Sequence, residues 1–64
     1  MIDKEVMTVS EVAEYLRVHN STIYRLLKAG RIPAFHVGSD WRFKRKHIDD
    51  WRIAQEKNTS ATNR

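Results

Sequence analysis

The 64-residue sequence has no cysteine and no apolar run near the roughly 20 residues that a membrane span needs. Without cysteine, a disulfide, a thiolate nucleophile and a cysteine-ligated zinc site are excluded. The first seven residues carry Asp3, Lys4 and Glu5 and lack the apolar segment of a signal peptide. We therefore expect one small domain in the cytoplasm, without contact to a membrane.

The sequence also lacks the side-chain groupings of an enzyme or a metal protein. His19, His36 and His47 are its only histidines, and no two of them stand four residues apart as zinc ligands on a helix do. No nucleophile is paired with a base in the sequence. We expect no catalytic activity, no metal and no cofactor.

Positive charge is concentrated in the middle of the chain. Residues 1–16 have a net charge of −3, and residues 17–52 have nine bases and three acids, a net charge of +6. A concentrated positive surface on a small domain attracts polyanions and speeds their encounter. This pattern favours a nucleic acid as the partner.

A capping box at Thr8 and Glu11 predicts the start of the first helix. In this motif each side chain can bond the backbone amide of the other residue. Apolar residues then follow with helical spacing and form one stripe: Val9, Val12, Ala13 and Leu16. We expect the helix to end near Arg17.

A second helix is predicted from Asn20 to Ala29. A polar turn precedes it, with His19 or Asn20 as the cap, and Gly30 follows it as a favoured stop. Ile23, Leu26 and Leu27 form its apolar stripe. Two short amphipathic helices separated by about three residues suggest a helix-turn-helix.

The segment from Ala34 to Lys44 predicts a two-stranded hairpin that turns at Gly38-Ser39-Asp40. We expect Trp41 and Phe43 to face inward as core residues. The predicted basic side of the hairpin consists of His36, Arg42 and Lys44, with Phe35 and Val37 on the opposite face.

A third helix is expected from Arg45 to Gln55, with Ile48 and Trp51 inward. Residues 1–7 are expected to be a lead-in, residues 8–55 the domain, and residues 56–64 a flexible polar tail because they contain no apolar stripe. The fold class is thus mainly α with a small β-hairpin, a winged helix-turn-helix in a single domain.

Binding to duplex DNA needs a rigid element for the major groove, donors for base edges and cations for phosphates. The free face of the second helix, the hairpin and the start of the third helix offer these groups. The candidate DNA-binding residues are Ser21, Thr22, Tyr24, Arg25, Lys28, Arg42, Lys44 and Arg45. Arg25 is the candidate for a bidentate contact to guanine.

An ordered series of residues resembles the small excisionase-type DNA-binding domain, a relative of the MerR-like winged helix-turn-helix. The series covers residues 7–51 and includes Thr8, Glu11, Ala13, Leu16, Ile23, Gly30, Ile32, Pro33, Val37, Gly38, Trp41, Arg42, Phe43, Ile48 and Trp51. The resemblance implies that the second helix reads the major groove and that the hairpin wing touches the backbone or minor groove. The long dimerising helix of MerR regulators does not follow Trp51, so a metal- or drug-sensing activator is not expected.

Several functions fit this resemblance. The first is an excisionase-like recombination directionality factor of a phage or mobile element, with an integrase or recombinase as a possible partner. The second is a minimal MerR-like transcription regulator. A third, of another class, is a protein-docking adaptor for a recombinase without direct DNA contact; RNA binding is disfavoured because no aromatic RNA-binding strand motif is present. We expect a monomer in solution that associates cooperatively on DNA.

Overall fold

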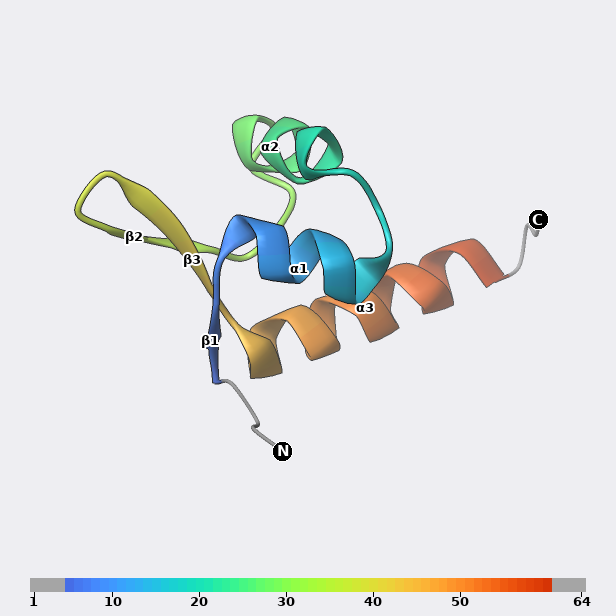
Figure 1. The fold of residues 1–64 in the computed structure, drawn as a ribbon. Helices are drawn as coiled ribbons and strands as arrows, with labels where there is room; N and C mark the ends of the chain where they lie inside the picture. The colour runs from blue at the N-terminus through green and yellow to red at the C-terminus, as the bar shows by residue number, and fades with distance from the viewer. Residues whose placement is uncertain (1–4, 61–64) are drawn as a thin grey trace.

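The computed structural model describes residues 5–60, and the side chains of residues 5–57 (Figure 1). The elements in chain order are β1 (Val6–Met7), α1 (Val9–Leu16), α2 (Asn20–Lys28), β2 (Phe35–Val37), β3 (Asp40–Lys44) and α3 (Arg45–Ser60). The predicted class is therefore confirmed: three helices and a small antiparallel sheet form a winged helix-turn-helix. The lead-in residues 1–4 and the tail residues 61–64 lie outside the described part.

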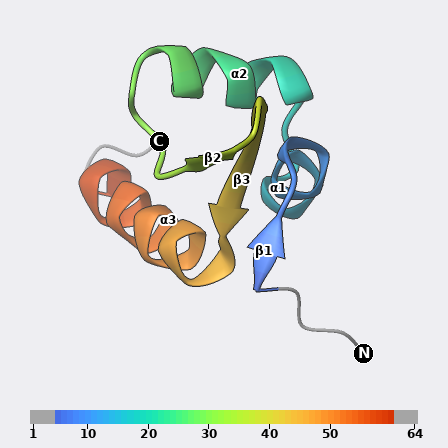
Figure 2. The ribbon, with the colours of Figure 1, turned by 90° about the vertical axis from the view of Figure 1, so that its left-hand side faces the viewer.

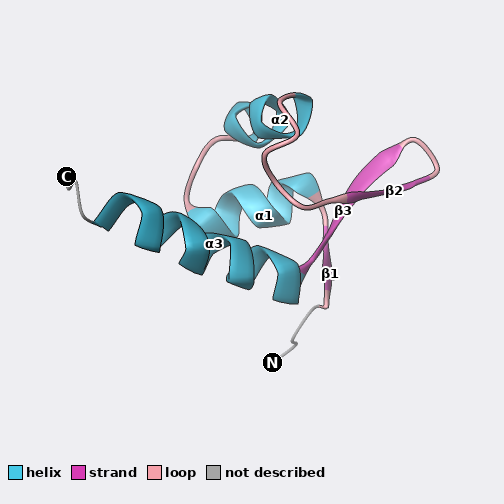
Figure 3. Ribbon diagram, turned by 180° about the vertical axis from the view of Figure 1, so that it is seen from behind, coloured by secondary structure: helices cyan, strands magenta, loops and turns pink. Residues whose placement is uncertain are grey.

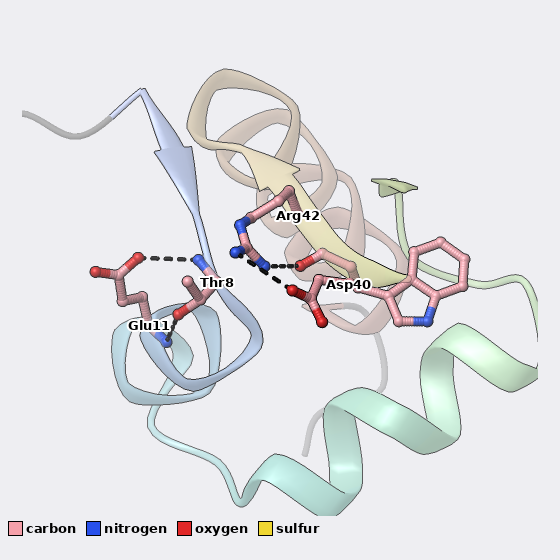
Figure 4. Close-up of polar contacts among 5 residues, drawn as sticks. Thr8, Glu11, Asp40 and Arg42 are labelled. Carbon is pink, nitrogen blue, oxygen red and sulfur yellow. Dashed lines mark hydrogen bonds and ion pairs between the residues drawn. The ribbon is translucent and has the colours of Figure 1, made fainter. Parts of the chain in front are cut away.

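The capping box at the start of α1 is confirmed (Figure 4). The Thr8 amide donates to Glu11 Oε1 at 2.9 Å, and the Glu11 amide donates to Thr8 Oγ1 at 3.2 Å. Two of the four orphan amides at the start of the helix are thereby satisfied, which fixes the point where the chain enters α1.

The end of α1 has a conformation that the sequence does not indicate. Arg17 adopts a left-handed backbone with φ 62° and ψ 46°. The amide of Arg17 donates to the Glu14 carbonyl at 3.1 Å, and the amide of Val18 donates to the Ala13 carbonyl at 2.9 Å. This pair of bonds is the Schellman motif, which usually has glycine at the left-handed position.

Helix α2 ends with the same motif, here with the expected glycine. Gly30 has φ 67°, its amide donates to the Leu27 carbonyl, and the amide of Arg31 donates to the Leu26 carbonyl. At the other end, His19 stands at the N-cap position but its side chain makes no capping bond.

The sheet has a third strand that the sequence pattern does not predict. Strand β1 pairs with β3, which lies in the centre of the order β1-β3-β2, and the register places Val6 opposite Lys44 and Met7 opposite Phe43. Met7 is buried in the core. The sheet therefore includes two residues ahead of residue 8, the expected start of the domain. The sequence does not predict this strand because two residues are too few to show a periodic pattern.

The register of the hairpin differs from the prediction. Val37 pairs with Asp40 and His36 with Trp41, so the turn has two residues, Gly38 and Ser39, instead of three. Gly38 takes the positive φ of 65° that such a turn requires. A shift of one residue exchanges the two faces of β2 relative to β3. His36 therefore shares the face of Trp41, which corrects its assignment to the side of Arg42 and Lys44.

The same register places Phe35 and Val37 on the face of Arg42. Phe35 pairs with Arg42, and the two apolar side chains are 41% and 53% exposed. They are not part of the core, although they alternate along the chain as half-buried strand residues do.

The core lies between the helices and the sheet and draws on almost every element. The buried residues are Met7, Val9, Val12, Ala13, Ile23, Ile32, Phe43 and Ile48. Leu16, Leu26, Leu27, Trp41 and Trp51 pack against them and are partly buried. The apolar stripes predicted for the three helices are therefore confirmed.

Helix α3 is longer than predicted, because it continues from Arg45 to Ser60 instead of ending near Gln55. Residues 56–60, expected to belong to the tail, are helical. An ion pair of Arg52 with Glu56 at 2.7 Å spans the predicted end. Such pairs at i and i+4 support a helix that has no apolar stripe.

The views from three sides show how the elements are arranged. In Figure 1, α2 lies above α1 and α3 below it. The hairpin of β2 and β3 projects beyond the helices as a wing (Figure 3). The tip of the wing is at the same end of the molecule as α2, whereas β3 leads away from α2 toward the start of α3 (Figure 2). Within residues 5–60, no helix is long and apolar enough to cross a membrane.

Candidate nucleic-acid interface

Four of the candidate residues form one exposed stripe along α2. Ser21, Tyr24, Arg25 and Lys28 are spaced i, i+3, i+4 and i+7, and all four are exposed. Ile23, on the opposite side, is completely buried and anchors the helix to the core. The helix therefore presents two hydroxyl groups and two cations on a single outward surface.

Thr22 lies at the edge of this stripe and is half-buried. Its hydroxyl accepts a long hydrogen bond from Arg25 Nη2 at 3.4 Å. The bond is weak and exposed, so the guanidinium of Arg25 keeps its other donors for an external partner.

The cations of α2 lie in a stretch of the sequence that has no acids. From Tyr15 to Ser39 the sequence contains no Asp or Glu, and within the described chain neither Arg25 nor Lys28 forms an ion pair. On α3, by contrast, cations are matched by acids one turn away, as in the pairs of Lys46 with Asp50 and of Arg52 with Glu56. The exposed face of α2 therefore carries positive charge that no described acid compensates.

Arg42, the candidate cation on the wing, already has two partners within the wing. Arg42 is half-buried; its Nη1 donates to the Trp41 carbonyl at 2.9 Å, and its Nη2 lies 3.9 Å from Asp40 Oδ2 (Figure 4). A carboxylate that is 69% exposed holds this contact loosely. The guanidinium can exchange Asp40 for an external anion.

The remaining two candidates stand apart from α2. Lys44 and Arg45 lie where β3 meets α3, away from the tip of the wing (Figure 2). Lys44 Nζ is 3.8 Å from a Glu5 carboxylate oxygen, and Arg45 Nε is 3.8 Å from Asp49 Oδ2. The structure therefore does not bring these two cations together with the stripe on α2.

Arg45 and Asp49 belong to a small cluster that joins α3 to α1. The Tyr15 hydroxyl donates to Asp49 Oδ1 at 2.5 Å, and the Arg45 guanidinium lies 5.7 Å from the centre of the Tyr15 ring. The hydrogen bond to Asp49 raises the pKa of Tyr15 above its ordinary value, because it stabilises the protonated phenol. These contacts indicate that Arg45 helps to hold α3 against α1.

The sequence pattern predicts a core position for Trp41, and in the structure this residue also lines a surface cleft. Together with Tyr24, Leu27 and Lys28 of α2, Trp41 lines a cleft of about 350 Å³ between α2 and the wing. The alternation along β3 already places Trp41 on the inward face with Phe43, but it does not indicate that this face meets α2 at Tyr24 and Lys28. Across residues 5–57, no three His, Asp or Glu side chains are close enough to hold a metal ion.

The two helices α1 and α2, the turn between them, and the wing define a winged helix-turn-helix domain. The chain belongs to the helix-turn-helix domain family, whose match covers residues 6–55. It is similar to two proteins from two strains of Mycobacterium tuberculosis, named "Putative DNA-binding protein Rv0500A" and "Putative DNA-binding protein MT0521". Each is 41% identical over 46 residues, which is 72% of this chain and 59% of the relative's own length. No solved structure matches the sequence.

Proposed function

We propose that this protein binds duplex DNA in a sequence-specific manner, with α2 in the major groove and the wing on the neighbouring backbone or minor groove. The observation that carries the proposal is the exposed stripe of Ser21, Tyr24, Arg25 and Lys28, whose cations have no acidic partner in the described chain. The family and the names of the two relatives agree with it.

The chemistry of the stripe suits the two tasks of a recognition helix. Arg25 can make two parallel hydrogen bonds to O6 and N7 of guanine, whereas Lys28, Ser21 and Thr22 can bond phosphate oxygens. The absence of acids between Tyr15 and Ser39 removes the repulsion that a phosphate would otherwise meet. Arg42 adds a cation on the wing.

The proposal that Arg25 contacts a base is tested by measuring the affinity of Arg25→Ala for a set of duplexes that differ at single positions. We expect a loss of about 1–3 kcal/mol confined to one base pair of the site. Arg52→Ala is the matched control, because Arg52 is also a helical arginine, half-buried, but is paired with Glu56 on α3. Equal weakening of Arg25→Ala on every duplex would exclude base reading.

The electrostatic part of the proposal is tested by the salt dependence of affinity. The logarithm of the binding constant should fall linearly with the logarithm of salt concentration, by about 0.9 for each phosphate contacted. Absence of binding to any duplex in dilute buffer would refute the proposal. A recombinase captured equally well after nuclease treatment and in high salt would instead support the adaptor function.

We further propose that the biological role is that of an excisionase-like recombination directionality factor, which binds neighbouring sites as monomers and associates cooperatively on DNA. The alternative is a minimal MerR-like transcription regulator. Both roles need the same protein surface, so substitutions on that surface cannot separate them. Footprinting can, because the two roles differ in the pattern of protected sites. Several adjacent protected sites in phase with the helical repeat near an integrase attachment site support the first, and one protected operator beside a promoter supports the second.

A further inference from the structure

The cleft between α2 and the wing is lined by residues from both elements. Tyr24 and Lys28 come from the exposed stripe of α2, Leu27 of the same helix packs against the core, and Trp41 comes from β3. The cleft is therefore located where an element in the major groove and an element on the adjacent groove would meet.

The polar atoms at this cleft have no partners in the part of the chain that is described. The Tyr24 hydroxyl, Lys28 Nζ and Trp41 Nε1 make no hydrogen bond or ion pair. The other tryptophan behaves differently, since Trp51 Nε1 donates to the Arg31 carbonyl at 2.8 Å. An indole N–H in a half-buried ring normally has an acceptor, so the free donor of Trp41 points to an external one.

The indole of Trp41 is held in place by its neighbours on the wing. The His36 ring, directly opposite on β2, stacks on it with a centroid distance of 3.7 Å and an interplanar angle of 30°. Arg42 bonds the carbonyl of the same residue. Because the ring is already ordered, it loses little conformational freedom when it contacts a ligand.

The geometry of duplex DNA identifies the occupant. The major and minor grooves are separated by a single sugar–phosphate strand, so a helix in one groove and a wing on the next must straddle that strand. We infer that this strand passes through the cleft, with one phosphate bound by Lys28 Nζ and Trp41 Nε1 and the adjacent sugar packed against the Tyr24 ring. Trp41 is then a DNA-contacting residue in addition to a core residue. The inference rests on the proposed function.

The two tryptophans allow a direct test on the unaltered protein. In ¹⁵N-labelled protein titrated with a cognate duplex, the indole N–H resonance of Trp41 should shift strongly, and that of Trp51 should stay near its free position. Trp41→Phe assigns the two signals. A duplex that binds while the Trp41 signal remains unshifted overturns the strand path but leaves the proposed function intact, whereas no binding at all refutes the proposed function itself.

Two substitutions test the contacts by affinity. Trp41→Phe keeps an aromatic ring, although a smaller one, and removes the donor; we expect about tenfold weaker binding on cognate and non-cognate duplexes alike, because the lost bond is to a charged backbone group. Lys28→Gln should lower the salt slope by about 0.9, the value for one phosphate. Lys46→Gln, an equal change of charge at an exposed lysine paired with Asp50, is the control and should leave the slope unchanged. A loss in Trp41→Phe that is confined to one base pair, or equal slopes for the two lysine variants, would contradict the strand path.

Discussion

Replacing Arg17 by glycine should stabilise the protein. Arg17 has φ 62° at the end of α1, where the Schellman motif requires a left-handed residue. Such a conformation costs a residue with a side chain about 1–2 kcal/mol, and glycine avoids this cost. Glycine also has more freedom in the unfolded chain, which offsets about 0.4–1 kcal/mol of the gain.

The net expectation for Arg17→Gly is a free energy of unfolding larger by about 0.5–1 kcal/mol. For a domain of this size this raises Tm by about 2–8 °C. Arg17 is exposed and forms no ion pair with any described residue, so no lost contact opposes the gain. Thermal unfolding followed by circular dichroism at 222 nm measures the shift.

Two control variants isolate the backbone argument. Arg25→Gly introduces glycine into the interior of α2 and should lower stability by about 1 kcal/mol. Gly30→Ala should also be destabilising, because Gly30 has φ 67°, although a Cβ there meets no atom within 4 Å. A lower Tm for Arg17→Gly, or an unchanged Tm for Gly30→Ala, would refute the reasoning from left-handed strain.

Three further predictions concern the cap, the cluster that joins α1 to α3, and the wing. Thr8→Ala removes the capping box and should lower the free energy of unfolding by about 1 kcal/mol in urea titrations, whereas Thr8→Ser should retain most of it. Tyr15→Phe should cost up to about 1 kcal/mol at neutral pH, because the hydrogen bond to Asp49 is exposed. Since the folded-state pKa of Tyr15 lies above 10.0, this contribution is complete below pH 10.0, is lost as pH rises through the folded-state pKa, and should be missing from the stability profile of the variant. Lys44→Ala and Arg45→Ala should weaken duplex binding in fluorescence titrations less than Lys28→Ala does, and an equal or larger loss would show that DNA reaches the far end of β3.

The parts of the fold that local chemistry determines could be predicted from the sequence. The capping box needs only Thr8 and Glu11 three residues apart, and the stop of α2 needs only Gly30 after the last apolar position. The amphipathic stripes follow from a helical period that does not depend on the rest of the chain. The exposed stripe of α2 could be predicted for the same reason.

The parts that depend on pairing between distant segments could not be predicted. Strand β1 exists because β3 offers a free edge, and nothing within Val6 and Met7 indicates it. The register of the hairpin depends on whether Asp40 belongs to the turn or to the strand, a choice of one residue that decides the face of His36. The cleft at Trp41 depends on how β3 lies against α2, which the alternation of residues along β3 does not indicate.

The junction of β3 and α3 joins the wing to the last helix without a linker. Lys44 ends the strand and Arg45 begins the helix with no residue between them, and the Arg45 amide is fixed to the Glu5 carbonyl at 2.8 Å. The start of α3 is held on the core, because Ile48 is buried and Trp51 Nε1 donates to the Arg31 carbonyl at 2.8 Å. The base of the wing therefore has no hinge, and a curved ligand must fit the orientation in which the fold holds the wing.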